Sequence, residues 1–238
     1  MQIRSAALTD IGKLRKKNED RYICDDVLQL YGVADGIGGL PYGAEAAQLA
    51  IDTLREAIAT APDDSLPDLV SLTRSVNNAV CNLSMQISPF GMGATLTYAL
   101  LRQNRLCLAH AGDSRCYCLR KAKLTALTTD HTVENEIRRD NTSGKFKFLS
   151  ESQLKSLTRC IGQQTELEVD TLRHPLNAGD RYLFCSDGID KAINESELAT
   201  ILSGEGEPRD ILRKLITLAN KRGGLDNATG VLVFVDAA

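Results

Sequence analysis

The chain of 238 residues contains no tryptophan, few other aromatic residues and no long apolar run. The scarcity of aromatic side chains leaves no stacking platform for single-stranded nucleic acid, and no block of Lys and Arg resembles the basic surface of a nucleic-acid-binding protein. No apolar stretch approaches the roughly 18 residues of a membrane-spanning helix, and the N-terminus lacks the apolar segment of a secretory signal. We therefore expect a cytoplasmic protein that binds neither nucleic acid nor a membrane.

Paired cysteines are also missing. The seven cysteines are odd in number and form no Cys-x-x-Cys pair, and the three histidines, His110, His131 and His174, are scattered. This pattern disfavours a zinc site. Because most of the cysteines lie in apolar segments, we expect buried, reduced thiols.

The hydrophobic pattern predicts a mixed order of helices and strands. Apolar residues at helical spacing predict helices over 44–60 and 66–87, the second with Ser65 as a cap and Pro67 in its first turn. Later helices are predicted from Asn194, with a capping box, and from 208 to 222. Predicted strands cover Arg21–Cys24, Leu28–Ala34, Ala94–Leu101, Leu106–Ala111, Arg115–Leu119, Leu124–Leu127, Arg181–Cys185 and Val231–Val235.

This order of elements is typical of an α+β fold rather than of a doubly wound sheet. Short connections between residues 94 and 127 favour an antiparallel meander. No linker or repeat divides the chain, so we expect one domain over residues 1–238. Residues 131–158 are polar and weakly patterned, which predicts a surface excursion with some helix near 152–157.

Acidic residues recur at the ends of the apolar strands, each beside Gly, Ser or Asn. Carboxylates at strand ends can converge at the rim of a sheet, where divalent cations offset their mutual repulsion, and Mg²⁺ and Mn²⁺ prefer such oxygen ligands. A single Asp-Gly pair is more often a turn, so spacing alone leaves a metal site and a set of surface turns as alternatives. The segments are Glu19-Asp20, Asp35-Gly36, Asp113-Ser114, Asp187-Gly188 and Asp226-Asn227.

Eight segments, in order along the chain, resemble those of the metal-dependent protein phosphatase family (PPM, protein phosphatase type 2C), especially its compact bacterial members. The similarity extends over nearly the whole chain. The segments are Gly12-x-x-Arg15-x-x-Asn18-Glu19-Asp20, Val33-Ala34-Asp35-Gly36-Ile37-Gly38-Gly39, Gly91-Met92-Gly93-Ala94-Thr95-Leu96, His110-Ala111-Gly112-Asp113-Ser114-Arg115, Thr129-Asp130-His131-Thr132, Leu157-Thr158-Arg159-Cys160-Ile161-Gly162, Cys185-Ser186-Asp187-Gly188-Ile189 and Asp226-Asn227-Ala228-Thr229.

The resemblance implies a four-layer α-β-β-α sandwich, in which two antiparallel sheets are flanked by helix pairs. It also implies that residues 133–156 form a variable flap that shapes substrate access. The function implied is hydrolysis of phosphoserine and phosphothreonine by a water that two Mn²⁺ or Mg²⁺ ions bridge and activate. The partners are then phosphorylated protein substrates, which a Ser/Thr kinase would supply, and we expect a monomer.

The first ion would be held mainly by residues early in the chain. Asp35 resembles the carboxylate that bridges both ions, and the backbone carbonyl of Gly36 would bind one of them, helped by the absence of a Cβ. Glu19 matches the acidic residue near that ion, and Asp20 would support the cluster.

The remaining roles fall on later residues and on Arg15. Asp187 and Asp226 match the ligands of the second ion, and Asp113 matches a residue that helps to hold a third, weaker ion. Arg15 matches the arginine that binds substrate phosphate, for which its planar fork is suited. His131 is a candidate acid for the leaving group, with fixation of a loop as the alternative.

Two further hypotheses stay open at this point. The chain could act on one regulator, such as an anti-sigma antagonist or a secretion-system scaffold. It could also be a catalytically inactive phosphoprotein-binding module of the same fold. Inactive relatives typically lose metal-ligand carboxylates, and none is missing here.

Overall fold

The strands form two five-stranded antiparallel sheets. The computed structural model describes residues 2–61, 67–140 and 148–237. The first sheet contains, in spatial order, β1 (Gln2–Asp10), β10 (Ala228–Ala237), β9 (Arg181–Cys185), β6 (Arg115–Arg120) and β7 (Lys123–Ala126). The second sheet contains, in spatial order, β2 (Asp20–Asp25), β3 (Leu30–Asp35), β4 (Leu96–Arg102), β5 (Arg105–Ala111) and β8 (Asp170–Pro175).

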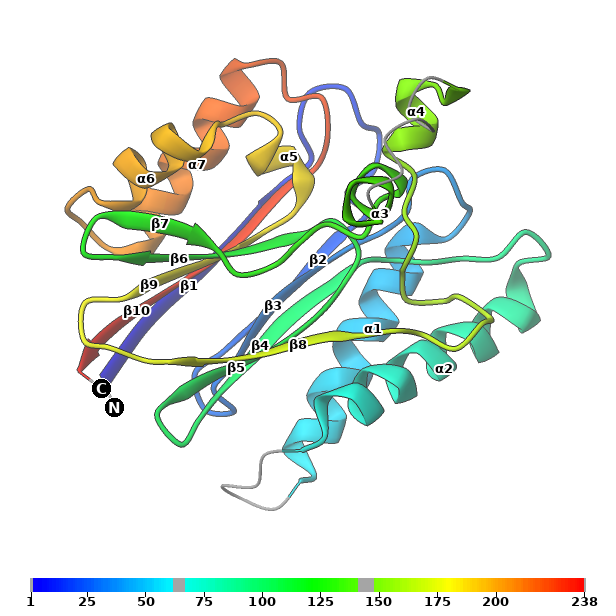
Figure 1. The fold of residues 1–238 in the computed structure, drawn as a ribbon, viewed down its shortest axis with the longest axis horizontal. Coiled ribbons are helices and arrows are strands. Elements are labelled where there is room, and N and C mark those ends of the chain that lie inside the picture. Colours follow the sequence, from blue (N-terminus) through cyan, green and yellow to red (C-terminus); the bar gives the residue numbers. More distant parts are fainter. Residues whose placement is uncertain (1, 62–66, 141–147, 238) are drawn as a thin grey trace.

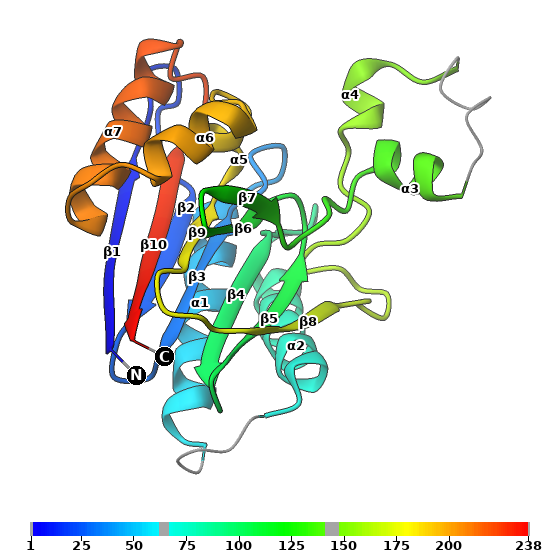
Figure 2. The same ribbon diagram turned by 60° about the vertical axis from the view of Figure 1, so that its left-hand side comes forward.

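Helices cover the outer face of each sheet. The pair α1 (Gly43–Ala59) and α2 (Leu69–Ile87) packs on the second sheet, and α7 (Pro208–Lys221) packs on the first with α5 (Asp187–Asp190) and α6 (Glu195–Leu202) beside it (Figures 1 and 2). The predicted four-layer α-β-β-α sandwich is therefore confirmed. Two short helices, α3 (Val133–Arg139) and α4 (Glu151–Leu154), lie in the predicted excursion and project away from the sandwich in Figure 2.

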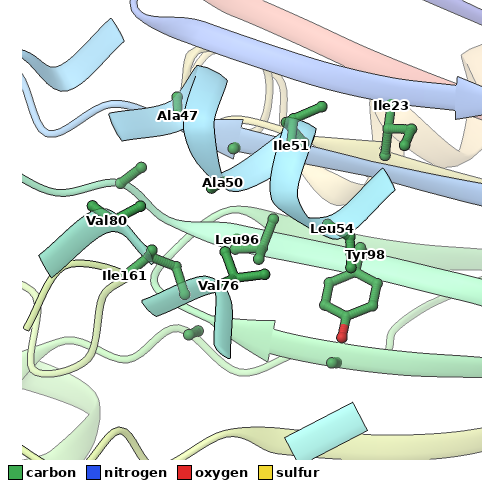
Figure 3. Packing of buried hydrophobic residues seen from close by; sticks show 14 of the residues in the cluster. Ile23, Ala47, Ala50, Ile51, Leu54, Val76, Val80, Leu96, Tyr98 and Ile161 are labelled. Atoms are coloured by element: carbon green, nitrogen blue, oxygen red, sulfur yellow. The ribbon is translucent and has the colours of Figure 1, made fainter. Parts of the chain in front are cut away.

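Apolar side chains fill each of the three spaces between the four layers. Between the second sheet and its helices, Ile51 and Leu54 of α1 and Val76 of α2 pack on Leu96 and Tyr98 of β4 (Figure 3). These five side chains are at most 3% exposed. Since complete burial of a large apolar side chain contributes about 1.5–3 kcal/mol, this layer holds the helix pair firmly against the sheet.

The alternation of side chains along β3 places an acidic residue between the two sheets. Leu30 and Ala34 face the helices, whereas Tyr31 and Val33 join the apolar cluster between the sheets. Successive side chains of a strand point to opposite faces, so Asp35, the next residue of this second series, also faces the space between the sheets. The strand ends there, at one edge of the sandwich.

The sequence pattern missed two strands and one crossing. Neither β1, which pairs with β10, nor β8, whose side chains are mostly exposed, was predicted. Neither strand carries the strong apolar alternation by which a strand is recognised. The meander over residues 94–127 is wrong, because β4 pairs with β5 and β6 with β7, but the chain crosses to the other sheet between β5 and β6.

The start of α2 also differs from the prediction. The cap is Asp68, whose side chain accepts a hydrogen bond from the N–H of Val70. Pro67 precedes the helix instead of lying in its first turn, and Ser65 lies outside the described residues. The capping box at Asn194 is confirmed. Among the helices that the structure describes, none is both long and apolar enough to span a bilayer.

Candidate metal centre

One cavity at the edge of the sandwich collects most of the predicted site residues. Its volume is about 140 Å³. Five carboxylates that are distant in sequence share its wall, and their convergence could not be derived from spacing. The lining residues are Arg15, Glu19, Asp35, Gly36, Ile37, Gly38, Thr95, Asp113, Leu157, Asp187, Asp226 and Asn227.

Asp20 lies beneath the cavity and not in its wall. It is paired with Asp35 across β2 and β3 and is 2% exposed. Its Oδ2 accepts a hydrogen bond of 2.7 Å from Ser186 Oγ, whereas Oδ1 has no hydrogen-bond partner within the described parts of the chain. Burial raises the pKa of Asp20 to about 6. Burial, followed by the charge of Asp20, raises the pKa of Asp35 well above its usual range.

A buried hydroxyl pair fixes the backbone of Asp35. The N–H of Asp35 donates to Thr95 Oγ1 at 3.0 Å, and that oxygen lies 2.7 Å from Ser114 Oγ. Neither hydroxyl was among the predicted site residues. Both lie within segments that resemble those of the family, and their place in these segments was the only sequence signal that could have identified them.

Gly36 is in close backbone contact with Gly43, the first residue of α1. A Cβ at Gly36 would lie 2.4 Å from the carbonyl carbon of Gly43 and 2.5 Å from its oxygen. Any side chain there would force the two segments apart. The glycine thus holds the start of α1 against the loop that follows Asp35.

Asn227, which follows Asp226 in the chain, forms a hydrogen bond with the backbone of Glu19. Its Oδ1 accepts from the N–H of Glu19 at 2.8 Å, and its Nδ2 donates to the carbonyls of Ile11 and Lys17. The neighbouring Asp226 accepts a hydrogen bond of 2.7 Å from Arg15 Nη2. Asn227 is a positioning residue that the sequence motif contains but that spacing does not single out.

Asp113 and Asp187 are bridged by a lysine. Lys191 Nζ forms an ion pair with Asp187 and lies 3.5 Å from Asp113 Oδ2. Both carboxylates are largely buried. Burial, and to a lesser extent the negative charge of Asp187, raises the pKa of Asp113 to about 6. Lys191 was not predicted as a site residue.

His131 lies outside the residues that line the cavity. Its Nδ1 accepts from the N–H of Gly112 at 3.1 Å, and its Nε2 lies 3.2 Å from Asp170 Oδ2. Burial lowers the pKa of His131. These contacts favour the loop-fixing role, since Gly112 immediately precedes Asp113.

The donor set fits Mg²⁺ or Mn²⁺. The cavity offers carboxylate and carbonyl oxygens, and burial and mutual repulsion disfavour ionised Asp20, Asp35 and Asp113 unless cations are present. Within the described parts of the chain, no three His, Cys, Asp or Glu side chains stand together as a ready-made metal site, so the carboxylates of the cavity would have to move closer to one another around a bound ion. Mg²⁺ usually keeps several of its waters, so it needs few ligands from the protein itself.

The sandwich and its acidic cavity together define a metal-dependent phosphatase. The family model described as "Protein phosphatase 2C" matches residues 17–222. The serine/threonine phosphatase stp of Listeria monocytogenes is 32% identical over an alignment of 234 positions, gaps included, that covers 94% of this chain and 93% of that protein.

Solved structures give the same result. PppA, described as a key regulatory component of T6SS in Pseudomonas aeruginosa, has 33% identity and a TM-score of 0.84, with 98% of each chain covered. The catalytic domain of the phosphatase PstP, solved with two manganese ions, has 32% identity and a TM-score of 0.82, with 98% of this chain and 97% of that chain covered. The chain belongs to the protein phosphatase 2C family and is a metal-dependent serine/threonine protein phosphatase.

Proposed function

We propose that the acidic cavity is the catalytic centre and that it hydrolyses phosphoserine and phosphothreonine in the substrates of a Ser/Thr kinase. Asp35 would contact both of two Mn²⁺ or Mg²⁺ ions, with the Gly36 carbonyl and Glu19 on one side. Asp187 and Asp226 would hold the other. The observation that carries the proposal is that these residues, from four distant segments, line one cavity.

Bound divalent ions supply a Lewis acid and lower the pKa of water. The chain's own residues provide the rest. Arg15 is half exposed at the cavity, and its bond to Asp226 uses one of the five N–H groups of the guanidinium. The remaining N–H groups form no other hydrogen bond with the residues that the structure describes, so they can bind phosphate oxygens and would stabilise negative charge as it develops. Leu157, just after the 133–156 segment, lines the cavity, which supports a role for that flap in substrate access.

The wider organisation follows the same reasoning. We propose one catalytic domain over residues 1–238, because one apolar cluster lies between the two sheets and is shared by them. All seven cysteines are free thiols, which supports a reducing, cytoplasmic location. A monomer is proposed, since the five carboxylates and Arg15, which the proposed chemistry needs, are all present in a single copy of the chain.

Removal of the metal tests the proposed function. With Mn²⁺, the protein is expected to hydrolyse a phosphothreonine peptide. Hydrolysis is expected to stop when EDTA is added and to return when Mn²⁺ is then added in excess. Phosphate release, followed in all three conditions, is the measurement. Activity that persists in EDTA would reject the proposal, and peptide binding without turnover would support the inactive module instead.

Replacement of Arg15 tests the phosphate contact. Arg15→Ala is expected to raise the KM for a phosphopeptide by about 10–100-fold, since a hydrogen bond to a charged group is worth about 1.5–3 kcal/mol. Arg15→Lys is expected to recover only part of this loss, because an ammonium lacks the planar fork. Steady-state kinetics of both variants provide the comparison. A KM that stays at the wild-type value in Arg15→Ala would exclude the contact.

A further inference from the structure

Lys191 occupies an unusual place for an exposed lysine. It follows the four-residue helix α5 and reaches back one turn to Asp187, while its Nζ also lies 3.5 Å from Asp113. The two carboxylates come from different strand ends, after β9 and after β5. Their side chains are 16% and 13% exposed, and both line the metal cavity.

We propose that Lys191 is a tethered cation that takes the place of a third divalent ion between Asp113 and Asp187. The inference rests on the proposed two-ion centre and extends it. The protein would then bind two exchangeable metal ions, and the ammonium of Lys191 would supply the positive charge at the third position.

The electrostatics of the site support this substitution. Two carboxylates that face one cavity repel each other, and a cation between them offsets that repulsion. A covalently tethered ammonium is present at high effective concentration whatever the level of free metal. It also excludes a second cation from the same place, because like charges a few ångströms apart repel strongly where water is scarce.

An ordinary surface ion pair would not have these consequences. Exposed pairs usually contribute little to stability and leave their surroundings unchanged. Here the anionic partners are largely buried and face the catalytic cavity. The lysine also lines a second cavity of about 280 Å³, whose wall includes Asp187 and Asp226. Shortening the side chain would therefore leave space beside Asp187 that is continuous with this cavity, and it would remove the ammonium from beside Asp113.

The number of bound Mn²⁺ ions tests the inference. Isothermal titration calorimetry and the electron paramagnetic resonance signal of free Mn²⁺ both count ions without reference to activity. The wild type is expected to bind two ions, and Lys191→Ala and Lys191→Asn are expected to bind three. Lys191→Arg keeps the charge and is expected to bind two.

Two further variants serve as controls. Lys191→Ala combined with Asp113→Asn should return to two ions, since the added ion would lose a ligand. Lys214→Ala, which removes an exposed lysine on α7, should bind two. Thermal unfolding in EDTA establishes that each variant is folded.

The outcomes separate the two proposals. Three ions in the wild type would overturn the proposal that Lys191 is a tethered cation, and so would two ions in both Lys191→Ala and Lys191→Asn when these variants are folded. Either result would leave the two-ion centre intact. A wild type that binds no Mn²⁺ would overturn the centre itself.

Discussion

Asp35→Asn is expected to lower kcat for phosphopeptide hydrolysis by about 10³-fold or more, because loss of even one electrostatic stabiliser costs about 10²–10³ in kcat. Asp35 is the carboxylate that would contact both ions, and it faces the space between the sheets at the end of β3. An amide carries no charge and has one oxygen in place of two. The measurement is single-turnover hydrolysis with saturating Mn²⁺.

The same substitution is expected to stabilise the metal-free protein. Burial and the charge of Asp20 raise the pKa of Asp35 well above its usual value. A carboxyl whose pKa is higher in the folded state than in the unfolded state favours folding at acid pH. It loses that contribution as the pH rises from the unfolded pKa to the folded one. Near neutral pH, Asp35 therefore destabilises the metal-free fold, and Asn removes this effect.

The matched control is Asp52→Asn on the exposed face of α1, where the carboxylate accepts a hydrogen bond from Gln48. Wild type and control should both show a Tm that rises with Mn²⁺, whereas Asp35→Asn should have a higher Tm in EDTA and respond little to Mn²⁺. Wild-type activity in Asp35→Asn, or an unchanged response of its Tm to Mn²⁺, would contradict the assignment.

Gly36→Ala is expected to reduce both stability and activity. The added Cβ would lie 2.4 Å from the carbonyl carbon of Gly43. The nearest atoms are all backbone atoms, which cannot move aside as the end of a flexible side chain can. Overpacking of this kind costs about 1–3 kcal/mol, and each kcal/mol lowers Tm by about 2–4 °C in a protein of this size. Because Gly36 directly follows Asp35, separation of the two segments would also displace the proposed bridging carboxylate.

Gly39→Ala provides the control within the same loop. Nothing among the described residues lies within 4 Å of a Cβ built at Gly39. The Tm and kcat of Gly39→Ala should therefore stay near those of the wild type. Chemical denaturation and phosphopeptide kinetics of the two variants, measured side by side, test the contact. Equal behaviour of the two variants would show that the Gly36–Gly43 approach has no role.

The part of the fold that could be predicted is the part with strong periodicity. The helices at 44–60 and 66–87 and strands such as Arg181–Cys185 follow from apolar spacing. The edge strand β8 buries little, so no apolar alternation marks it. The crossing between β5 and β6 spans only Gly112 to Ser114. Such a short connection gives no sign that the next strand joins the other sheet.

The candidate site was predictable only in its acidic residues. Strand-end carboxylates suggested a metal centre, but the resemblance was needed to bring Asp35, Asp187 and Asp226 to one place. Asn227 and Lys191 act through contacts with residues that are distant in the chain, Glu19 and Asp113 respectively. A single sequence carries no information on such pairs until the fold brings them together.

Diffraction from crystals grown with Mn²⁺, recorded at the manganese absorption edge, tests the central claim most directly. Two anomalous peaks are predicted in the cavity, both within coordination distance of the Asp35 carboxylate and one also beside Asp187 and Asp226. An absence of peaks beside Asp35, with manganese bound elsewhere or not at all, would contradict the account.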